Sequence, residues 1–334
     1  MKRKLAFLLM LCFGWSFFLN GCDGTLPKTD DRLQVVCTIF PEYDWARQLT
    51  QGVDNVDLTL LVKNGTDLHS YQPSVRDIAM IARADVFCYV GGVSDTWVND
   101  VLDTTENRTA QLVSMAEAAD ADEEVLAEGM QAEHEHEHEH EHEHHDDEND
   151  SHEEPPELDE HVWLSLRRAA LACTAMKEAL CKADPAHEDI YNQNCTDYLQ
   201  KLQELDSDFT EMTSQAARDT IVVADRFPFR YLAEDYGLTY YAAFPGCSAE
   251  TEASFETIVF LSEKVESLHL PCVLVTEGSN SSLAKTILEN ASSDGKILTL
   301  QSLQAVSQKE IDTGVTYLSK MQENYDVLKQ ALNS

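Results

Sequence analysis

Residues 33–40 read LQVVCTIF, and this stretch decides the fold of the first half of the chain. Its apolar and β-branched residues indicate a buried strand, and a helix is expected to begin near Pro41. Two similar short runs follow at residues 56–62 and 85–90, and a capping box that begins at Ser74 predicts a helix between them. Strands that alternate with helices predict a parallel sheet covered by helices.

A second series of strands, TIVVAD, GLTYYAAF, PCVLVTE and KILTL, begins at Thr220 and leads to a helix expected at residues 316–332. Between the two series, Asp184-Pro185 is a helix start, and neither Gly nor Pro interrupts residues 186–219. The sequence therefore predicts an α/β protein with two lobes of parallel sheet, flanking helices and one long rigid connecting helix. The expected first lobe, connecting helix and second lobe are residues 33–183, 184–218 and 219–334.

The chain is strongly acidic. Its 334 residues hold 24 Lys and Arg against 60 Asp and Glu, a formal net charge of −36, with an ordinary hydrophobic fraction of 43%. This balance argues against nucleic acid or anionic lipid as a partner and favours a cation. Beyond the N-terminus no apolar run is long enough to span a membrane, so the body of the protein is not expected to be an integral membrane protein.

The N-terminus has the pattern of a bacterial lipoprotein signal. Three basic residues precede the apolar stretch 5–19, which ends in Leu19-Asn20-Gly21-Cys22. We expect a signal peptide at residues 1–21, lipidation of Cys22 and a tether at residues 22–32. The protein is then extracytoplasmic and held to the bacterial cell membrane by its lipid. A plain secretory signal or a single anchor helix is the alternative.

Removal of the signal and lipidation of Cys22 leave seven cysteines, an odd number that cannot all pair within the chain. No CxxC occurs, so neither a zinc ribbon nor a thioredoxin-type redox site is indicated. The sequence leaves the disulfide state open.

The segment 133–152, EHEHEHEHEHEHHDDENDSH, holds eight of the twelve histidines. It lies in a stretch, residues 117–160, that has 21 acidic residues and no Lys or Arg. The segment has no apolar residue to bury, so it is expected to be solvated and mobile, within an acidic, disordered loop at residues 117–158. Neutral imidazoles ligate Zn, Cu or Ni, so auxiliary metal capture is favoured over a simple polar spacer. The histidines of this tract are His134, His136, His138, His140, His142, His144, His145 and His152.

Two further histidines are candidate metal ligands. His69 lies between an expected strand and a capped helix, where α/β sheets place ligands, and His161 follows the acidic tract at the start of the next helix. A lone His at a helix start is usually structural. A pair in the same half of the chain as a His-rich tract favours a metal site.

The chain resembles the metal-binding receptors of bacterial ABC importers for zinc and manganese, a family that includes streptococcal adhesin-type lipoproteins. The resemblance rests on DLHSYQPSVRDIAMIARADVFCYVGG, the HEHE loop, DEHVWLSL, DPAHEDIYNQN and FRYLAEDYGL. It implies the cluster A-I type of substrate-binding fold, with four strands in each lobe, a rigid backbone helix and one metal ion between the lobes. By motif match, His69 and His161 take the places of the family's first two ligands.

The match fails in the second lobe. Arg226 takes the family's third ligand position, and a guanidinium cannot ligate a cation, whereas the preceding Asp225 can. Gln301 replaces the family's last Asp, and Glu277 is the other acid at the end of a strand there. The expected site is therefore His69 and His161 with Asp225 and Glu277. The alternative is an Arg226–Glu277 ion pair, with Asp225 or water completing the sphere.

The resulting functional hypothesis is a monomeric receptor, not an enzyme, that captures Zn²⁺ and delivers it to an ABC permease in the cytoplasmic membrane. Carboxylates in place of a third His make Mn²⁺ the alternative cargo, while the His-rich tract favours Zn²⁺. Three alternatives stay open: an extracytoplasmic metal-dependent hydrolase, a surface adhesin, and a receptor for a siderophore or corrinoid. No HExxH or GxSxG motif supports the hydrolase.

Overall fold

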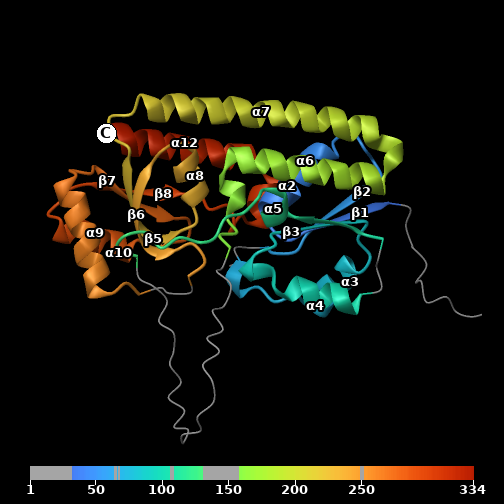
Figure 1. Cartoon of the computed structure of the whole chain (residues 1–334), viewed down its shortest axis with the longest axis horizontal. Coiled ribbons are helices and arrows are strands. Elements are labelled where there is room, and N and C mark those ends of the chain that lie inside the picture. The colour runs from blue at the N-terminus through green and yellow to red at the C-terminus, as the bar shows by residue number, and fades with distance from the viewer. Residues whose placement is uncertain (1–31, 64–65, 67, 106–108, 131–157, 249–251) are drawn as a thin grey trace, which may run out of the picture. The chain divides into compact units, whose positions relative to one another are not determined.

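The first half of the chain builds a four-stranded parallel sheet with strand order β2-β1-β3-β4 (Figure 1). The structure is a computed structural model that describes residues 32–63, 66, 68–105, 109–130, 158–248 and 252–334. The strands are β1 (Leu33–Cys37), β2 (Val56–Leu60), β3 (Val86–Tyr89) and β4 (Gln111–Ser114). The sequence predicted the first three of these strands. It did not predict β4, because only Val113 of its four residues is buried.

Helices cover this sheet, and their starts follow local sequence signals. The capping box at Ser74 is confirmed, since its hydroxyl accepts a hydrogen bond from the Asp77 N–H while the Asp77 carboxylate accepts one from the Ser74 N–H. The α-helices are α2 (Phe40–Leu49), α3 (Val75–Ile81), α4 (Trp97–Thr104), α5 (Met115–Ala118) and α6 (Leu166–Ala183). Short 3₁₀ turns are η1 (Leu68–Ser70), η2 (Val93–Asp95) and η3 (Val162–Leu164).

The second half repeats the architecture, with strand order β6-β5-β7-β8 and all pairs parallel. Its strands are β5 (Thr220–Phe227), β6 (Thr239–Pro245), β7 (Cys272–Thr276) and β8 (Lys296–Leu300), and each overlaps one of the four predicted apolar runs. Its helices are α8 (Arg230–Asp235), α9 (Phe255–Ser267), α10 (Ser282–Asn290), α11 (Gln308–Asp312) and α12 (Tyr317–Asn333). The predicted two-lobed α/β fold is confirmed. No helix in the described part of the chain is both long and apolar enough to cross a membrane.

The connection between the lobes is a long helix preceded by a 3₁₀ turn. The turn is η4 (Pro185–His187), and the helix is α7 (Glu188–Ser214), shorter at both ends than the expected 184–218. The Asp184 carboxylate accepts hydrogen bonds from His187 Nδ1 at 2.7 Å and from the Tyr191 hydroxyl at 2.8 Å, so it ties the turn to the first part of α7. An unbroken helix of 27 residues is a stiff connector.

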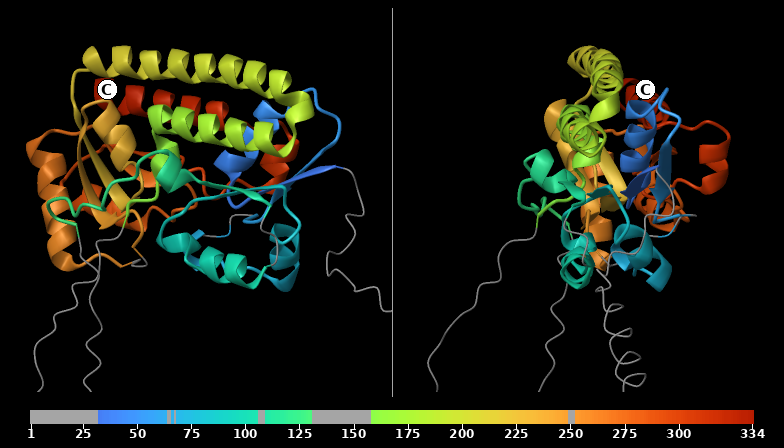
Figure 2. Two further views of the ribbon diagram at one scale, coloured as in Figure 1. Left: turned by 45° about the vertical axis from the view of Figure 1, so that its right-hand side comes forward. Right: turned by 90° about the vertical axis from the view of Figure 1, so that its right-hand side faces the viewer.

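A single hydrophobic core runs through both lobes. It joins residues of β1 and β3 to residues of β5, β7 and α12, and α12 packs on α7 and also on α2 (Figure 2). Polar contacts cross the same region: Trp163 Nε1 donates to the Ser302 carbonyl at 2.8 Å, and the Tyr317 hydroxyl donates to the Trp163 carbonyl at 2.6 Å. Because the lobes share a packed interior, we expect little movement of one against the other.

The acidic loop begins later than the sequence predicted. Residues 117–130 belong to the described part of the chain, where α5 ends at Ala118, Arg168 donates to the Ala119 carbonyl at 2.7 Å, and Glu123 forms an antiparallel bridge with Leu158. The start expected at residue 117 is therefore wrong, because this stretch pairs with residues after the His-rich tract. The remainder of the expected loop, residues 131–157, lies outside the described residues.

Tyr317→Phe should lower the free energy of unfolding by about 1–3 kcal/mol, because the buried Trp163 carbonyl loses the hydroxyl donor. Urea denaturation of the purified protein measures the change. The matched control is Tyr325→Phe on the same helix, whose hydroxyl has no hydrogen-bond partner among the described residues and whose ring is only partly buried. Equal stability of the two variants would contradict the assigned role of Tyr317.

Candidate metal centre

His69 reaches the site from the 3₁₀ turn η1, which follows β2. The fully buried Leu68 anchors this turn in the core of the first lobe. The His69 ring places Nδ1 2.7 Å from the Ser94 hydroxyl and 3.4 Å from Glu160 Oε1. The contact with Ser94 orients the ring toward the segment that precedes η3.

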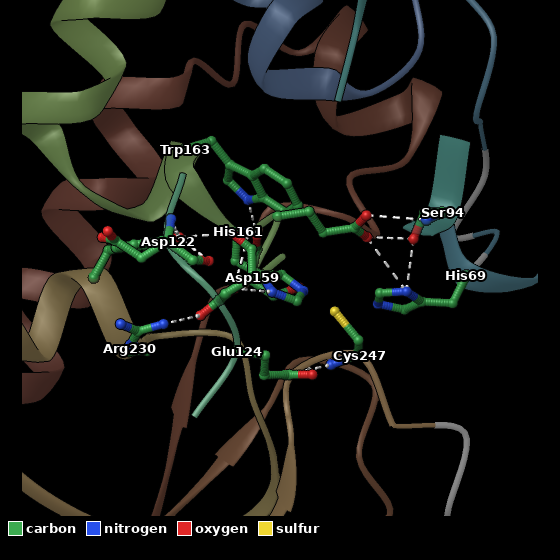
Figure 3. Close-up of polar contacts among 12 residues, drawn as sticks. His69, Ser94, Asp122, Glu124, Asp159, His161, Trp163, Arg230 and Cys247 are labelled. Carbon is green, nitrogen blue, oxygen red and sulfur yellow. Dashed lines mark hydrogen bonds and ion pairs between the residues drawn. The ribbon is translucent and has the colours of Figure 1, made fainter. Parts of the chain in front are cut away.

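That segment, Asp159-Glu160-His161, is buried although all three side chains ionise; their exposed fractions are 2%, 0% and 0%. Asp159 Oδ1 accepts hydrogen bonds from the His161 peptide N–H at 3.1 Å and from His161 Nδ1 at 2.9 Å (Figure 3). A carboxylate on Nδ1 fixes the tautomer and leaves Nε2 as the ligating nitrogen. His161 Nε2 is buried and has no hydrogen-bond partner among the described residues.

Glu160 completes a compact donor group with the two histidines. Its carboxylate accepts a hydrogen bond from the Ser94 N–H at 3.0 Å, and its other oxygen contacts the Ser94 hydroxyl. One potential ligand atom from each of His69, Glu160 and His161 lies within 4.8 Å of the others, and the two imidazole centroids are 5.7 Å apart. Nitrogen and carboxylate oxygen at this spacing are a donor set for a divalent transition metal.

Buried acids lie in and beside the candidate site. Burial raises the pKa of Glu160, the pKa of Asp95 to about 7 and the pKa of Glu42 to about 8. A neighbouring acid adds to each shift: Asp159 to that of Glu160, Glu160 to that of Asp95, and Asp95 to that of Glu42. For His161, burial alone lowers the pKa, but the hydrogen bond and charge of Asp159 reverse this and raise it. Buried carboxylates without an equal number of cations cost free energy, which a bound divalent cation offsets.

The two carboxylates expected from the second lobe lie outside this group. Asp225 Oδ2 accepts hydrogen bonds from the Thr276 hydroxyl at 2.8 Å and from the Thr276 N–H at 3.4 Å. Asp225 therefore ties β5 to β7, at the point where the pairing of β5 with β6 shifts register. Both oxygens of Glu277 accept from Ser302, at 2.6 Å from its N–H and 2.6 Å from its hydroxyl. Neither acid belongs to the group formed by His69, Glu160 and His161, and both bond within the second lobe. Their role as metal ligands stays a prediction.

Three residues of the site were missed in the sequence. Glu160, Asp159 and Ser94 gave no separate signal, since two of them are among 21 acids of one stretch and Ser94 is an ordinary loop residue. One signal was available: at Asp159-Glu160-His161-Val162-Trp163 the polar tract changes to an apolar run. Acids at such a change are buried with the run, as Asp159 and Glu160 are here. The eight histidines of the tract and Cys22 lie outside the described residues.

Comparison with known proteins shows the family to which this chain belongs. Residues 35–331 match the family described as "Zinc-uptake complex component A periplasmic". The zinc-binding lipoprotein AdcA of Streptococcus pneumoniae is 31% identical over 330 residues, 99% of this chain, but the chain spans only 61% of that relative's length. The high-affinity zinc uptake system protein ZnuA of Bacillus subtilis is 30% identical, with 98% of this chain and 94% of that protein covered.

Solved structures agree with this assignment. The Zn(II)-bound ZnuA-like domain of Streptococcus pneumoniae AdcA has a TM-score of 0.68 and 28% identity, with 91% of this chain and all of that chain covered. The laminin-binding protein Lmb of Streptococcus agalactiae, with a TM-score of 0.71 and 22% identity, shows the shared fold alone. The chain belongs to the family of periplasmic A components of zinc-uptake complexes.

Proposed function

We propose that this protein is the extracytoplasmic receptor of an ABC zinc-uptake system, and that His69, Glu160 and His161 bind the Zn²⁺ it carries. The observation that carries the proposal is the buried His–Glu–His group, whose donor atoms lie within 4.8 Å of one another. Family membership and the zinc-bound relative support Zn²⁺ as the cargo over Mn²⁺. They also support a transport receptor over a hydrolase.

The proposed mechanism is capture and delivery without covalent chemistry. The His-rich tract at residues 133–152 raises the concentration of Zn²⁺ near the site, which holds the ion until the protein docks on a permease. Cys22 carries the lipid that keeps the receptor at the membrane, after removal of residues 1–21. The stiff connection and the shared core support a receptor that works with little change in the angle between its lobes.

His69→Ala or His161→Ala should each weaken Zn²⁺ binding at the tight site by more than about 100-fold. Loss of a residue that only hydrogen-bonds a metal ligand lowers metal affinity about 10- to 100-fold, and loss of the ligand itself should cost more. Deletion of residues 133–152 should leave one tight site and remove only weaker sites. Isothermal titration calorimetry measures both. His187→Ala is the matched control, because that histidine contacts Asp184 at the start of α7, outside the site. Unchanged tight binding in either site variant would refute the assignment.

Zn²⁺ binding should weaken as the pH falls from about 8 to about 6, a range that includes the ordinary His pKa of about 6.5. The pKa of His161 is raised, burial acting against the shift and Asp159 driving it, so protons compete with the metal at higher pH than for a free imidazole. The raised pKa of Glu160 acts in the same direction. Titrations at several pH values measure the effect, and affinity independent of pH over this range would contradict it.

Cys22→Ser should release the receptor from the membrane fraction of the producing cell, because acyl chains are the only proposed anchor. Fractionation followed by mass spectrometry of the N-terminal peptide measures this. Cys181→Ser, in helix α6, is the matched control and should remain with the membrane. Retention of the Cys22→Ser protein at the membrane would favour the anchor-helix alternative.

A further inference from the structure

The second lobe reaches the metal centre at the end of β6. Strands β5 and β6 run parallel with Phe227 opposite Pro245, so Gly246 and Cys247 emerge at the carboxyl edge of the sheet. A Cβ on Gly246 would lie 2.8 Å from Cε1 of His161 and 3.1 Å from the Phe227 carbonyl oxygen. Glycine alone therefore permits this backbone to pack directly on the His161 ring, and it brings the next residue to the site.

Cys247 differs from the other described cysteines in its surroundings. Those six, Cys37, Cys88, Cys173, Cys181, Cys195 and Cys272, all lie in or against the main hydrophobic core. Cys247 belongs to none of the hydrophobic clusters of the described residues, and its thiol is not in a disulfide. In Figure 3 the thiol projects into the space between the rings of His69 and His161.

The neighbours of Cys247 are the acids of the metal centre. Its N–H donates to Glu124 Oε1 at 3.3 Å, which holds the loop after β6 against the segment after α5. Burial raises the pKa of the Cys247 thiol well above its usual range, and the negative charges of Glu160, Glu124 and Asp159 raise it further. The thiol is therefore protonated before metal binding, and a divalent cation among these acids would favour the thiolate.

His161 supplies an independent sign of a ligand in the same space. Its side chain is fully buried, Asp159 occupies Nδ1, and Nε2 has no hydrogen-bond partner within the part of the chain that the structure describes. A buried nitrogen lone pair left without a donor costs free energy unless something fills the position. Two imidazoles, one carboxylate and one thiolate together make the four-coordinate set of N, O and S ligands that Zn²⁺ takes.

We propose that Cys247 is the zinc ligand contributed by the second lobe, in the role that the sequence suggested for Asp225 and Glu277. The inference rests on the proposed function, since it names a ligand of the same site. As the Zn–S bond forms, the S–H bond breaks and the proton passes to water. A thiolate ligand favours Zn²⁺ over Mn²⁺, because manganese prefers oxygen ligands.

Cobalt substitution tests the ligand directly. The full-length wild-type protein, kept reduced and loaded with one equivalent of Co²⁺, should show an intense near-ultraviolet sulfur-to-cobalt charge-transfer band. Cys247→Ser should lose this band and bind Zn²⁺ about 10- to 100-fold more weakly. This is the loss in affinity found when a residue that hydrogen-bonds a metal ligand is removed, so it is a lower bound for a ligand. Cys181→Ser, the matched control, should keep both the band and the affinity. Persistence of the band in Cys247→Ser, or its absence from wild type, would overturn the proposal.

X-ray absorption of the zinc-loaded wild-type protein gives a second measurement that needs no variant. One sulfur scatterer at about 2.3 Å is expected beside nitrogen and oxygen at about 2.0–2.2 Å. A shell of nitrogen and oxygen alone would overturn the role of Cys247 while leaving the receptor function intact. Failure of the wild-type protein to bind any Zn²⁺ or Co²⁺ tightly would instead refute the proposed function itself.

Discussion

The hydrogen bond between Asp159 and His161 is the contact on which the candidate metal centre depends. Asp159 Oδ1 accepts from both the ring Nδ1 and the peptide N–H of His161, so one carboxylate sets the tautomer and the ring orientation. Asp159 is itself held from the second lobe, because the Tyr231 hydroxyl donates to its carbonyl at 2.7 Å and Arg230 lies 4.0 Å from Oδ2. The direction of His161 Nε2 is thus decided by both lobes.

The same short segment carries the packing between the lobes. Trp163 follows His161 by two residues, their rings lie 5.1 Å apart, and its indole and carbonyl bond to Ser302 and Tyr317 of the second lobe. Movement of one lobe against the other would break these buried contacts and disturb the histidine. A site built this way is preorganised, which lowers the ordering cost of binding an ion.

Acidic side chains are buried in the first lobe, among them Glu42, Asp95, Asp159 and Glu160. Of these, Asp159 contacts His161 and Glu160 contacts His69, while Glu42 and Asp95 accept hydrogen bonds from backbone N–H groups of the first lobe. A divalent ion at the candidate site would offset the cost of burying the Asp159 and Glu160 carboxylates beside the two histidines. Gly246 adds the second lobe to this arrangement by allowing its backbone to contact the His161 ring.

Local patterns were sufficient for the architecture and for two of the site residues. The apolar runs predicted seven of the eight strands, the Ser74 box predicted α3, and His69 and His161 were recognisable from their positions beside expected strands and helices. These signals are local because strand burial and helix capping depend on residues a few positions apart.

The completion of the site was decided by tertiary structure. Glu160 could not be separated from the acids around it, and Asp225 and Glu277 matched the requirement for acids at strand ends, yet Thr276 and Ser302 hold them elsewhere. Cys247 gave no signal at all, since its place beside His161 depends on the register of β5 with β6 and on the close approach at Gly246. Which side chains meet in a space between two lobes depends on contacts between residues far apart in the chain, and spacing along the sequence does not encode them.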